Sequence, residues 1–306
     1  MSEDIIDVLI VGAGPAGLQA AVHAVRKKAG VKVFGRIEAS SLYEAHVENY
    51  LCVSGVSAGG DLLAVAREQA SSFGADIINE DVLSLEQKDN LFLVRSESAE
   101  FLARSVILAT GTSRKKLGVA GEKEFAGRGV SYCVDCDANF FRQAKVAVVG
   151  NGSAAADGAL TLLNYASEVF LLADKLDLAP DLAARLAASA VQVKETSVKE
   201  IVGNNAVESL LLTDGSKLEL EGVFIELGAK GALELAVNIG VGLDMETMSR
   251  IETNKRMETN IQGIYAAGDI VGPPYQMAKA VGDGCTAGWY AANYANKLRR
   301  QEEAGS

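Results

Sequence analysis

The hydrophobic pattern at the start of the chain predicts a strand, a tight turn and a helix. Residues Ile5–Val11 read IIDVLIV, an almost unbroken apolar run, and such a run is typical of a strand that is buried on both faces of a parallel sheet. A glycine-rich turn over Gly12–Gly17 follows, then a helix over about Leu18–Lys28 and a second strand at Val31–Phe34. The segment therefore predicts a β-α-β unit.

The same pattern returns near the middle of the chain. The run KVAVV at Lys145–Val149 predicts a strand, the turn Gly150–Gly152 follows, and a helix over about Ser153–Asn164 leads to another strand at Val169–Leu172. The two units lie about 138 residues apart. This spacing indicates two nucleotide-binding folds rather than a solenoid, whose repeats would be shorter.

The last part of the chain again has an apolar run followed by a turn. Ile261–Ala267 is largely apolar, and a helix is expected over about Gly284–Leu298. This return to strand-then-loop character suggests that the end of the chain completes the first domain. We therefore expect an α/β protein with two Rossmann-like nucleotide-binding domains, the second inserted in the first.

Composition and charge argue against binding to nucleic acid and against a membrane-spanning helix. The 306 residues are 49% hydrophobic, which suits two folded domains. The net charge of -11, without a long basic run, argues against nucleic-acid binding. No apolar run reaches the roughly 18 residues that a membrane helix needs, and Met1–Ile6 carries two carboxylates, unlike a signal peptide. A cytoplasmic protein is expected.

The turn after the first strand reads G-A-G-P-A-G and fits the dinucleotide-binding pattern G-x-G-x-x-G. In that pattern Gly12 permits the tight turn, Gly14 lets a pyrophosphate approach the backbone, and Gly17 allows close helix–strand packing. The N-terminus of the helix that follows the turn attracts anions. The alternative is a purely structural glycine turn, but the motif stands between a strand and a helix, which is the context that it requires.

Cys133 and Cys136 form a C-x-x-C motif. A zinc site would need two more ligands. The other cysteines, Cys52 and Cys285, are isolated and the chain has only two histidines, so no metal site is expected. A redox role needs a vicinal pair whose thiolate forms readily, and a pair beside a flavin satisfies that. The two isolated cysteines are expected to be small buried hydrophobes.

Two aspartates carry further candidate chemistry. Asp137 directly follows the cysteine pair and can shuttle a proton during dithiol chemistry; the alternative is an exposed residue or a helix cap. Asp269 follows Gly268 at the end of a predicted strand, where a carboxylate can accept a hydrogen bond from a ribityl or ribose hydroxyl. Alone, a Gly-Asp pair is more often a plain turn, so this assignment depends on a family resemblance.

Six motifs together resemble the low-molecular-weight thioredoxin reductase family. They are, in chain order, GAGPAG at 12–17, VENY at 47–50, LATGT at 108–112, YCVDCD at 132–137, METNIQGIYAAGDI at 257–270 and GDGC at 282–285. The match covers most of the chain, and the order and spacing of the motifs are specific to that family.

The resemblance implies the architecture of an FAD/NAD(P)-linked disulfide reductase. Residues 1–114 and 246–306 would form a discontinuous FAD-binding domain, and residues 115–245 an inserted NAD(P)-binding-like domain that carries the C-x-x-C. The FAD would be lined by Gly12, Gly14, Pro15, Ala16, Gly17, Asn49, Thr110, Gly111, Gly268, Asp269 and Gln276.

The resemblance also implies roles and partners. Cys136 would face the flavin, Cys133 would attack the disulfide of thioredoxin, and Asp137 would be the acid–base group. The inserted domain would rotate so that the dithiol meets either the flavin or thioredoxin, and the protein would be a homodimer.

The chain departs from the family where the electron donor would bind. NADPH-dependent members carry a His-Arg-Arg run that grips the 2′-phosphate, and this chain has Ala173-Asp174-Lys175 there. Asp174 lies about 20 residues past the second glycine turn, where a Rossmann unit normally bonds a ribose 2′-hydroxyl. Because a carboxylate repels a phosphate, NADPH is disfavoured, even if Asp174 is only a solvated turn residue.

The flavin side departs as well. The Gly-Gly-Gln loop before VENY is missing, and the usual Arg-Gln near the flavin reads Tyr275-Gln276. With these changes the chain looks like the pyridine-nucleotide-independent branch, which includes the ferredoxin-linked flavin thioredoxin reductases of anaerobes.

Three electron donors stay open: ferredoxin or another protein or deazaflavin donor, a nicotinamide cofactor (NADH rather than NADPH), and a second FAD in the inserted domain, as in diflavin relatives. An acidic ferredoxin would need a local basic patch, for which Arg114, Lys115 and Lys116 are candidates. A flavin-binding or sensing protein without turnover is a further alternative. The intact C-x-x-C followed by Asp137 argues against it.

Overall fold

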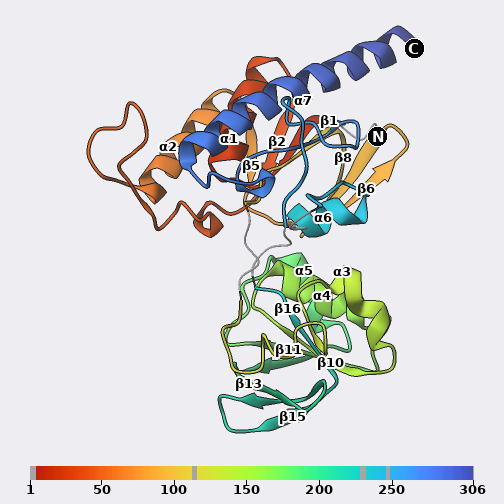
Figure 1. The fold of residues 1–306 in the computed structure, drawn as a ribbon. Coiled ribbons are helices and arrows are strands. Elements are labelled where there is room, and N and C mark those ends of the chain that lie inside the picture. Colours follow the sequence, from red (N-terminus) through yellow and green to blue (C-terminus); the bar gives the residue numbers. More distant parts are fainter. Residues whose placement is uncertain (1–4, 112–115, 228–231, 246–248, 306) are drawn as a thin grey trace. The chain divides into compact units, whose positions relative to one another are not determined.

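The computed structural model describes residues 5–111, 116–227, 232–245 and 249–305 (Figure 1). The chain divides into two compact units. The first comprises Met1–Ser113 and Gly231–Ser306, and the second comprises Arg114–Lys230. Among the described residues, no helix combines the length and the apolar character needed to cross a membrane.

The first unit is built on a seven-stranded sheet with the order β5-β2-β1-β8-β7-β6, and β17 pairs with β8 outside that path. Strands β5, β2, β1, β8 and β17 run parallel, and β7 and β6 extend the sheet in antiparallel pairing. The strands are β1 (Ile6–Val11), β2 (Val31–Phe34), β5 (Asp76–Ile78), β6 (Val82–Lys88), β7 (Leu91–Ser96), β8 (Glu100–Leu108) and β17 (Ile264–Ala266).

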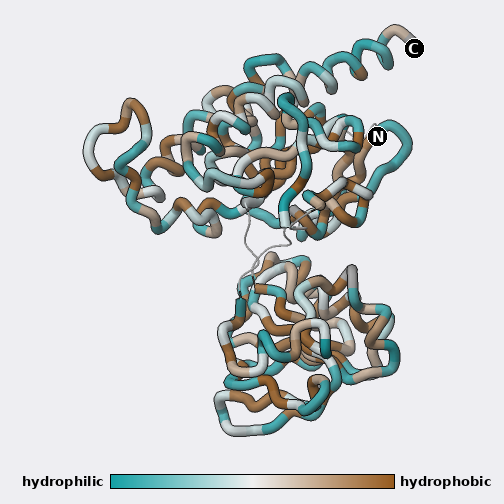
Figure 2. Tube along the Cα trace, viewed as in Figure 1, coloured by the Kyte–Doolittle hydropathy of each residue, from teal (hydrophilic) through white to brown (hydrophobic). Residues whose placement is uncertain are grey.

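Hydrophobic side chains pack on both faces of this sheet. On one face they join the strands to the helices α1 (Pro15–Arg26), α2 (Gly59–Ser72) and α7 (Met277–Gly305). A second cluster of hydrophobic side chains, from strands that include β6 and β7, joins the sheet to the short helix α6 (Ala232–Asn238). Figure 2 shows this as hydrophobic residues on the inner strands and a hydrophilic outer end of α7. All six residues of β1 are buried, as the apolar run predicts.

Two glycines bring α7 into close contact with α1, and the two helices lie side by side (Figure 1). A Cβ atom on Gly284 would lie 2.1 Å from the carbonyl oxygen of Ala16, and one on Gly288 would lie 2.2 Å from that of Ala20. Residues four apart share a helix face. The contact therefore depends on glycine at both positions.

A buried charge network ties the outer half of α7 to the start of β1. The Asp7 carboxylate accepts hydrogen bonds from the Gly30 backbone N–H at 2.8 Å, from Arg104 at 3.2 Å and from Arg299 at 2.6 Å. Arg104 also forms an ion pair with Glu302. Asp7 and Arg104 are both buried, and buried charges are tolerated when they are paired, so the network holds β1, β8 and α7 together.

Short elements connect these parts. The 3₁₀ helix η1 (Ile37–Ala39) follows β2, and the strands β3 (His46–Val47) and β4 (Ser57–Ala58) pair antiparallel before α2. The 3₁₀ helix η3 (Asp269–Val271) lies between β17 and α7.

The second unit repeats the parallel-sheet pattern on a smaller scale. Its five-stranded sheet has the order β12-β11-β10-β16-β9, and the antiparallel sheet β13-β14-β15 shares a hydrophobic core with it. The elements are β9 (Val130–Ser131), α3 (Val134–Asp137), η2 (Ala138–Phe141), β10 (Lys145–Val149), α4 (Ser153–Leu162), β11 (Glu168–Ala173), α5 (Pro180–Ala187), β12 (Gln192–Glu195), β13 (Val198–Gly203), β14 (Val207–Leu212), β15 (Lys217–Glu219) and β16 (Gly222–Ile225).

The expected α/β fold with two Rossmann-like units is confirmed, and β2 and β10 have the expected bounds. Helix α1 begins at Pro15 rather than Leu18, because proline suits the first turn of a helix. Helix α7 begins at Met277 rather than Gly284 and reaches Gly305. Its glycines weaken the helical pattern in the sequence, whereas in the structure two of them serve its contact with α1.

The second compact unit ends at Lys230, before the expected domain limit at residue 245. The reason is α6, whose Leu235 and Ala236 are fully buried against Val82 and Leu85 of β6. Their burial places α6 in the hydrophobic core of the first unit.

We expect the substitution Gly288→Val to lower the midpoint of urea unfolding of the apoprotein by the equivalent of about 1–3 kcal/mol, because the added side chain would force α7 away from α1. Gly282→Ala is the matched control. It lies in the same helix with nothing within 4 Å of an added Cβ, and it should stabilise by up to about 1 kcal/mol. Equal effects of both substitutions on the unfolding midpoint would show that α7 does not depend on the close contact.

Candidate functional site

The first glycine turn joins β1 to α1 through contacts that only glycine permits. Gly12 has a φ of 114°, and a Cβ on it would lie 2.3 Å from the carbonyl oxygen of Ala109. Its backbone N–H donates to the Phe34 carbonyl oxygen at 2.7 Å. A Cβ on Gly17 would lie 1.9 Å from the Gly12 carbonyl oxygen. The turn is therefore pressed against the ends of β2 and β8.

The helix after this turn presents an open N-terminus. Gly14 is the residue before the first turn of α1, no side chain caps it, and Pro15 occupies the first helical position. The first backbone N–H groups of a helix have no partner within the helix, and they attract anions. Gly14 also leaves room: an added Cβ would meet only the Ser40 hydroxyl, at 3.4 Å. This geometry suits a pyrophosphate.

The loops after β8 and β17 reach the same edge of the sheet as the glycine turn. Thr110 and Gly111 follow β8, and Gly111 has a φ of 75°. The Ala109 N–H donates to the Val11 carbonyl oxygen at 2.8 Å. A Cβ on Gly268, after β17, would lie 3.0 Å from the Cβ of Ala16. The structure thus brings the predicted residues of three distant segments to one place.

Lys279, in the first turn of α7, holds the loop that carries Asp269. Its ammonium group donates to the carbonyl oxygens of Gly268 at 2.7 Å and Gly272 at 2.8 Å, and it forms an ion pair with Asp283 at 2.8 Å. Asp283 in turn accepts from the Gly268 N–H at 3.2 Å. The sequence analysis did not single out Lys279, which carries no motif of its own.

Asp269 is a partly buried carboxylate whose environment disfavours its charge. Burial raises its pKa above the ordinary value for an aspartate, the neighbouring Lys279 offsets part of this, and Asp283 adds to it. A hydroxyl group that donates a hydrogen bond to this carboxylate would stabilise the charged form.

Asn49 and Gln276 meet although 227 residues separate them in the sequence. The Asn49 side-chain amide donates to the Gln276 side-chain oxygen at 3.0 Å. The remaining donors and acceptors of both amides can serve a ligand. The sequence predicted both residues separately, and the structure places them together.

In the second unit, Cys133 is buried just before helix α3. It is disulfide-bonded. The side chain of Cys136 lies outside the described part of the structure. Cys52 and Cys285 are free thiols. The expectation that these two are buried is wrong for Cys52, which is exposed in a loop with a φ of 72°, and Cys285 is only half-buried.

Ser131 connects Cys133 to Asp137. The Ser131 hydroxyl donates to the Asp137 carboxylate at 2.7 Å and accepts from the Cys133 backbone N–H at 3.1 Å. The Asp137 N–H donates to the Cys133 carbonyl oxygen at 3.2 Å. These bonds hold the Asp137 side chain close to the start of α3. Ser131 is buried at the end of β9, and no pattern in the sequence marked it.

Glu226 connects the second glycine turn to the same helix. Its carboxylate accepts from the Val134 N–H at 3.2 Å, and a Cβ on Gly150 would lie 1.9 Å from its carbonyl oxygen. Glu226 is buried directly after β16. The sequence analysis missed it, although a carboxylate after an apolar strand is the signal that led to Asp269.

Asp174 stands directly after β11, as expected for the residue that contacts a ribose in a Rossmann unit. Its side chain is exposed and accepts a hydrogen bond from the Ser197 hydroxyl. The Asp177 N–H donates to the Asn151 carbonyl oxygen at 2.8 Å. The loop after β11 thus folds back onto the second glycine turn.

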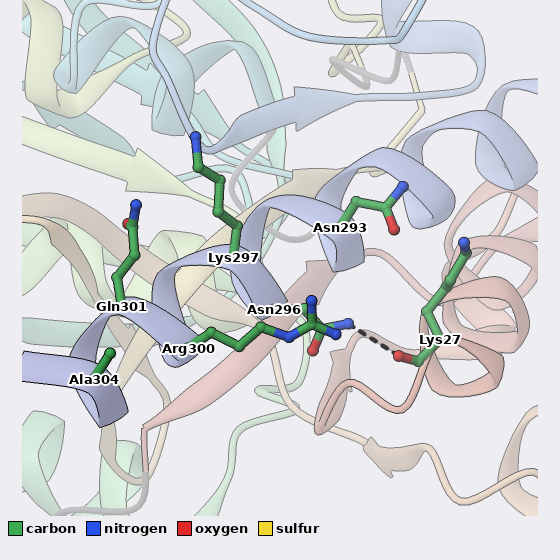
Figure 3. Close-up of a pocket in the computed structure, with 7 residues that line it drawn as sticks. All are labelled: Lys27, Asn293, Asn296, Lys297, Arg300, Gln301 and Ala304. Atoms are coloured by element: carbon green, nitrogen blue, oxygen red, sulfur yellow. Dashed lines mark hydrogen bonds between the residues drawn. The ribbon is translucent and has the colours of Figure 1, made fainter.

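A pocket of about 450 Å³ lies elsewhere on the first unit, between the end of α1 and the outer half of α7 (Figure 3). It is lined by Lys27, Asn293, Asn296, Lys297, Arg300, Gln301 and Ala304. The Asn296 amide donates to the Lys27 carbonyl oxygen at 2.9 Å. Since Asp269 and Gln276 adjoin the opposite end of α7, this pocket is separate from the candidate site.

Two Rossmann-like units, an open glycine turn in the first and a disulfide in the second define a dinucleotide-dependent disulfide oxidoreductase. The chain belongs to the pyridine nucleotide-disulphide oxidoreductase family, which it matches over residues 6–284.

Characterised relatives narrow this assignment. The chain is 36% identical to the thioredoxin reductase of Bacillus subtilis, with 98% of each protein covered. It is 32% identical to that of Peptoclostridium litorale, over 97% of this chain and 99% of the relative.

Two solved structures resemble the chain over nearly its whole length. The atypical thioredoxin reductase TRi from Desulfovibrio vulgaris Hildenborough matches with a TM-score of 0.82 and 34% identity, over 95% of this chain and 98% of that one. A ferredoxin-flavin thioredoxin reductase from Clostridium acetobutylicum matches with a TM-score of 0.68 and 35% identity, over 96% and 98%. The chain is therefore an enzyme, a flavin-dependent disulfide oxidoreductase of the thioredoxin reductase type.

The residues of the first unit fit the FAD that this family implies. The open helix N-terminus beside Gly14 suits a diphosphate. The Asp269 carboxylate and the Asn49–Gln276 amide pair supply acceptors and donors for hydroxyl and ring atoms.

We expect Asp269→Asn to stabilise the apoprotein near neutral pH, because the substitution removes a carboxylate whose charge the fold disfavours. The pKa of Asp269 is raised in the folded state, so the gain should be present above that pKa and disappear as the pH falls towards the unfolded value. Thermal unfolding of both apoproteins across this range measures it. The same variant should bind FAD about tenfold more weakly. A gain that persists in acid would contradict the assigned cause.

Proposed function

We propose that the chain reduces the disulfide of thioredoxin through a dithiol formed by Cys133 and Cys136, with Asp137 as the acid–base group. The observation that carries this proposal is the disulfide at Cys133 together with the Ser131 hydroxyl that links it to Asp137. The relatives that match the chain along its length are thioredoxin reductases, which supports thioredoxin as the substrate.

The chemistry follows from the cysteine pair. FAD bound in the first unit would supply the electron pair that reduces the disulfide of Cys133. The reduced Cys133 thiolate then attacks the disulfide of thioredoxin to form a mixed disulfide, and the Cys136 thiolate attacks Cys133 to release reduced thioredoxin. Asp137 exchanges the protons that the thiols release and take up.

An exposed aromatic residue in the 3₁₀ helix that directly follows α3 supports a protein substrate. Phe140, in η2, exposes 82% of its surface, whereas its neighbour Phe141 packs edge-on against Phe224 at 5.0 Å between ring centres. Because Phe141 anchors the segment, Phe140 is held at the surface. Exposed aromatic residues of this kind are common anchors of protein interfaces.

The FAD-binding part would be the first unit, and its ligands would be the predicted set from Gly12 to Gln276. The open glycine turn and the residues gathered at the same edge of the sheet support this assignment. A homodimer stays an expectation from the family resemblance.

For the electron donor we propose ferredoxin rather than NADPH. Asp174 puts a carboxylate where a 2′-phosphate would lie, and the loop after β11 is bonded to the second glycine turn through Asp177 and Asn151. Both features disfavour NADPH at that turn, and one solved relative is a ferredoxin-flavin enzyme. Arg114 and Lys115, two of the three residues suggested as a basic docking patch, lie outside the described residues. NADH and a second FAD are the alternative ligands of the second nucleotide fold.

We expect Cys133→Ser and Cys136→Ser each to reduce thioredoxin reduction at least about 10³-fold while the FAD content is unchanged, since each removes one half of the dithiol. The flavin of each variant is kept reduced chemically, and the variant then reduces thioredoxin. The rate is followed by the precipitation of insulin, which reduced thioredoxin causes. Cys52→Ser, which replaces a free exposed thiol, is the matched control and should keep the wild-type rate. A wild-type rate in either C-x-x-C variant would rule out the dithiol mechanism.

We expect reduced ferredoxin to bleach the visible flavin band of the anaerobic protein, and NADPH to leave it unchanged because Asp174 repels the 2′-phosphate. Stepwise anaerobic titration with NADPH, NADH and then reduced ferredoxin measures this. Rapid bleaching by NADPH would contradict the proposal for the donor. Two flavins per chain would instead indicate a second FAD.

A further inference from the structure

The loop after β2 carries an arginine, Arg36, at the place where a dinucleotide-binding fold usually carries an acidic residue. An Asp or Glu about 20 residues past the glycine turn normally bonds the adenosine ribose. Asp174 is 22 residues past Gly152 in the second unit, and Arg36 is 22 residues past Gly14 in the first. The two halves of the chain thus have opposite charges at equivalent positions.

Arg36 is held by two carboxylates. Its guanidinium donates to Glu97 at 2.7 Å and lies 3.5 Å from the Asp81 carboxylate. Glu97 is buried and also accepts from the Asp81 N–H at 2.9 Å, so the acidic frame is itself fixed. The nitrogen atoms of the Arg36 guanidinium thus face Glu97 and Asp81, while 23% of the Arg36 side chain stays exposed.

The segment that begins with Arg36 borders the glycine turn. A Cβ on Gly35 would lie 2.8 Å from the backbone nitrogen of Ala13, so β2 ends in contact with the turn. The Ser40 hydroxyl, at the other end of η1, lies 3.4 Å from an added Cβ on Gly14. Arg36 is therefore the first side chain after β2 that can reach a nucleotide lying across the turn.

We propose that Arg36, oriented by Glu97 and Asp81, is the platform for the adenosine half of FAD. A guanidinium presents a flat face on which an aromatic ring stacks. Two carboxylates against one cation leave a net negative charge around Arg36, which suits an adenosine without a 2′-phosphate. Arg36 thus gives the first unit a preference for FAD over FMN, which carries the same ring system and one phosphate but no adenosine. This proposal rests on FAD binding in the first unit.

The test compares two flavins on the apoprotein. The Kd for FAD should rise about tenfold in two variants. Arg36→Lys keeps the ion pair but loses the flat face. The double variant Arg36→Gln/Glu97→Gln leaves no unpaired charge between these two partners. The Kd for FMN should change by less than about twofold. Both constants are measured from the flavin fluorescence at equilibrium.

The FMN constant is also the control for folding, because FMN uses the same glycine turn and Asp269. Equal weakening of both flavins would assign Arg36 a purely structural role, and no change for FAD would remove it from the nucleotide site; either result overturns the proposal. A wild-type apoprotein that binds neither flavin would instead contradict FAD binding in the first unit. Ser98→Ala, in the same turn as Glu97 but bonded to Glu80, should bind both flavins as the wild type does.

Discussion

The structure of the first unit depends on backbone atoms approaching one another more closely than side chains would allow. At the end of β1, Gly12 lies against the Ala109 carbonyl group and Gly35 lies against the backbone of Ala13, and in each case a Cβ would overlap with backbone atoms. Because backbone cannot move aside as a flexible side chain can, these glycines fix how far apart the ends of β1, β2 and β8 lie. The residues in the loops after β1, β2 and β8 are therefore held at a fixed spacing from one another.

The same contact in the second unit serves a different purpose. There Gly150 lies against the Glu226 backbone, and the Glu226 carboxylate bonds the first residue of the helix that follows Cys133. The glycine turn of the second unit is thus connected through Glu226 to the helix that follows Cys133, whereas that of the first leaves the N-terminus of α1 without a side-chain cap. One local backbone pattern leaves an open helix N-terminus in one half of the chain and fixes the start of α3, next to Cys133, in the other.

The sequence predicted the parts of this protein whose signal is local. The two β-α-β units, the glycine turn and the C-x-x-C each lie within a few residues, so periodicity and spacing reveal them. Lys279 and Ser131 could not be predicted, because their hydrogen bonds arise from loop and turn geometry that leaves no motif. Glu226 had a signal of its own, a carboxylate after an apolar strand, but its contact with Val134 joins residues 92 apart in the sequence and could not be predicted. The start of α7 was placed too late because Gly282 and Gly284 are unfavourable in a helix by propensity, and the sequence does not show that α1 lies against Gly284.

The order of segments along the chain has a consequence for biosynthesis. Residues 114–230 are contiguous, so the second unit can fold as soon as it leaves the ribosome, since domains generally fold as units during synthesis. The first unit cannot, because β17, Asp269 and the whole of α7 are translated last, and Arg299 near the end of α7 pairs with Asp7 near the start of β1. The whole of the second unit is therefore translated before the segments that complete the first unit.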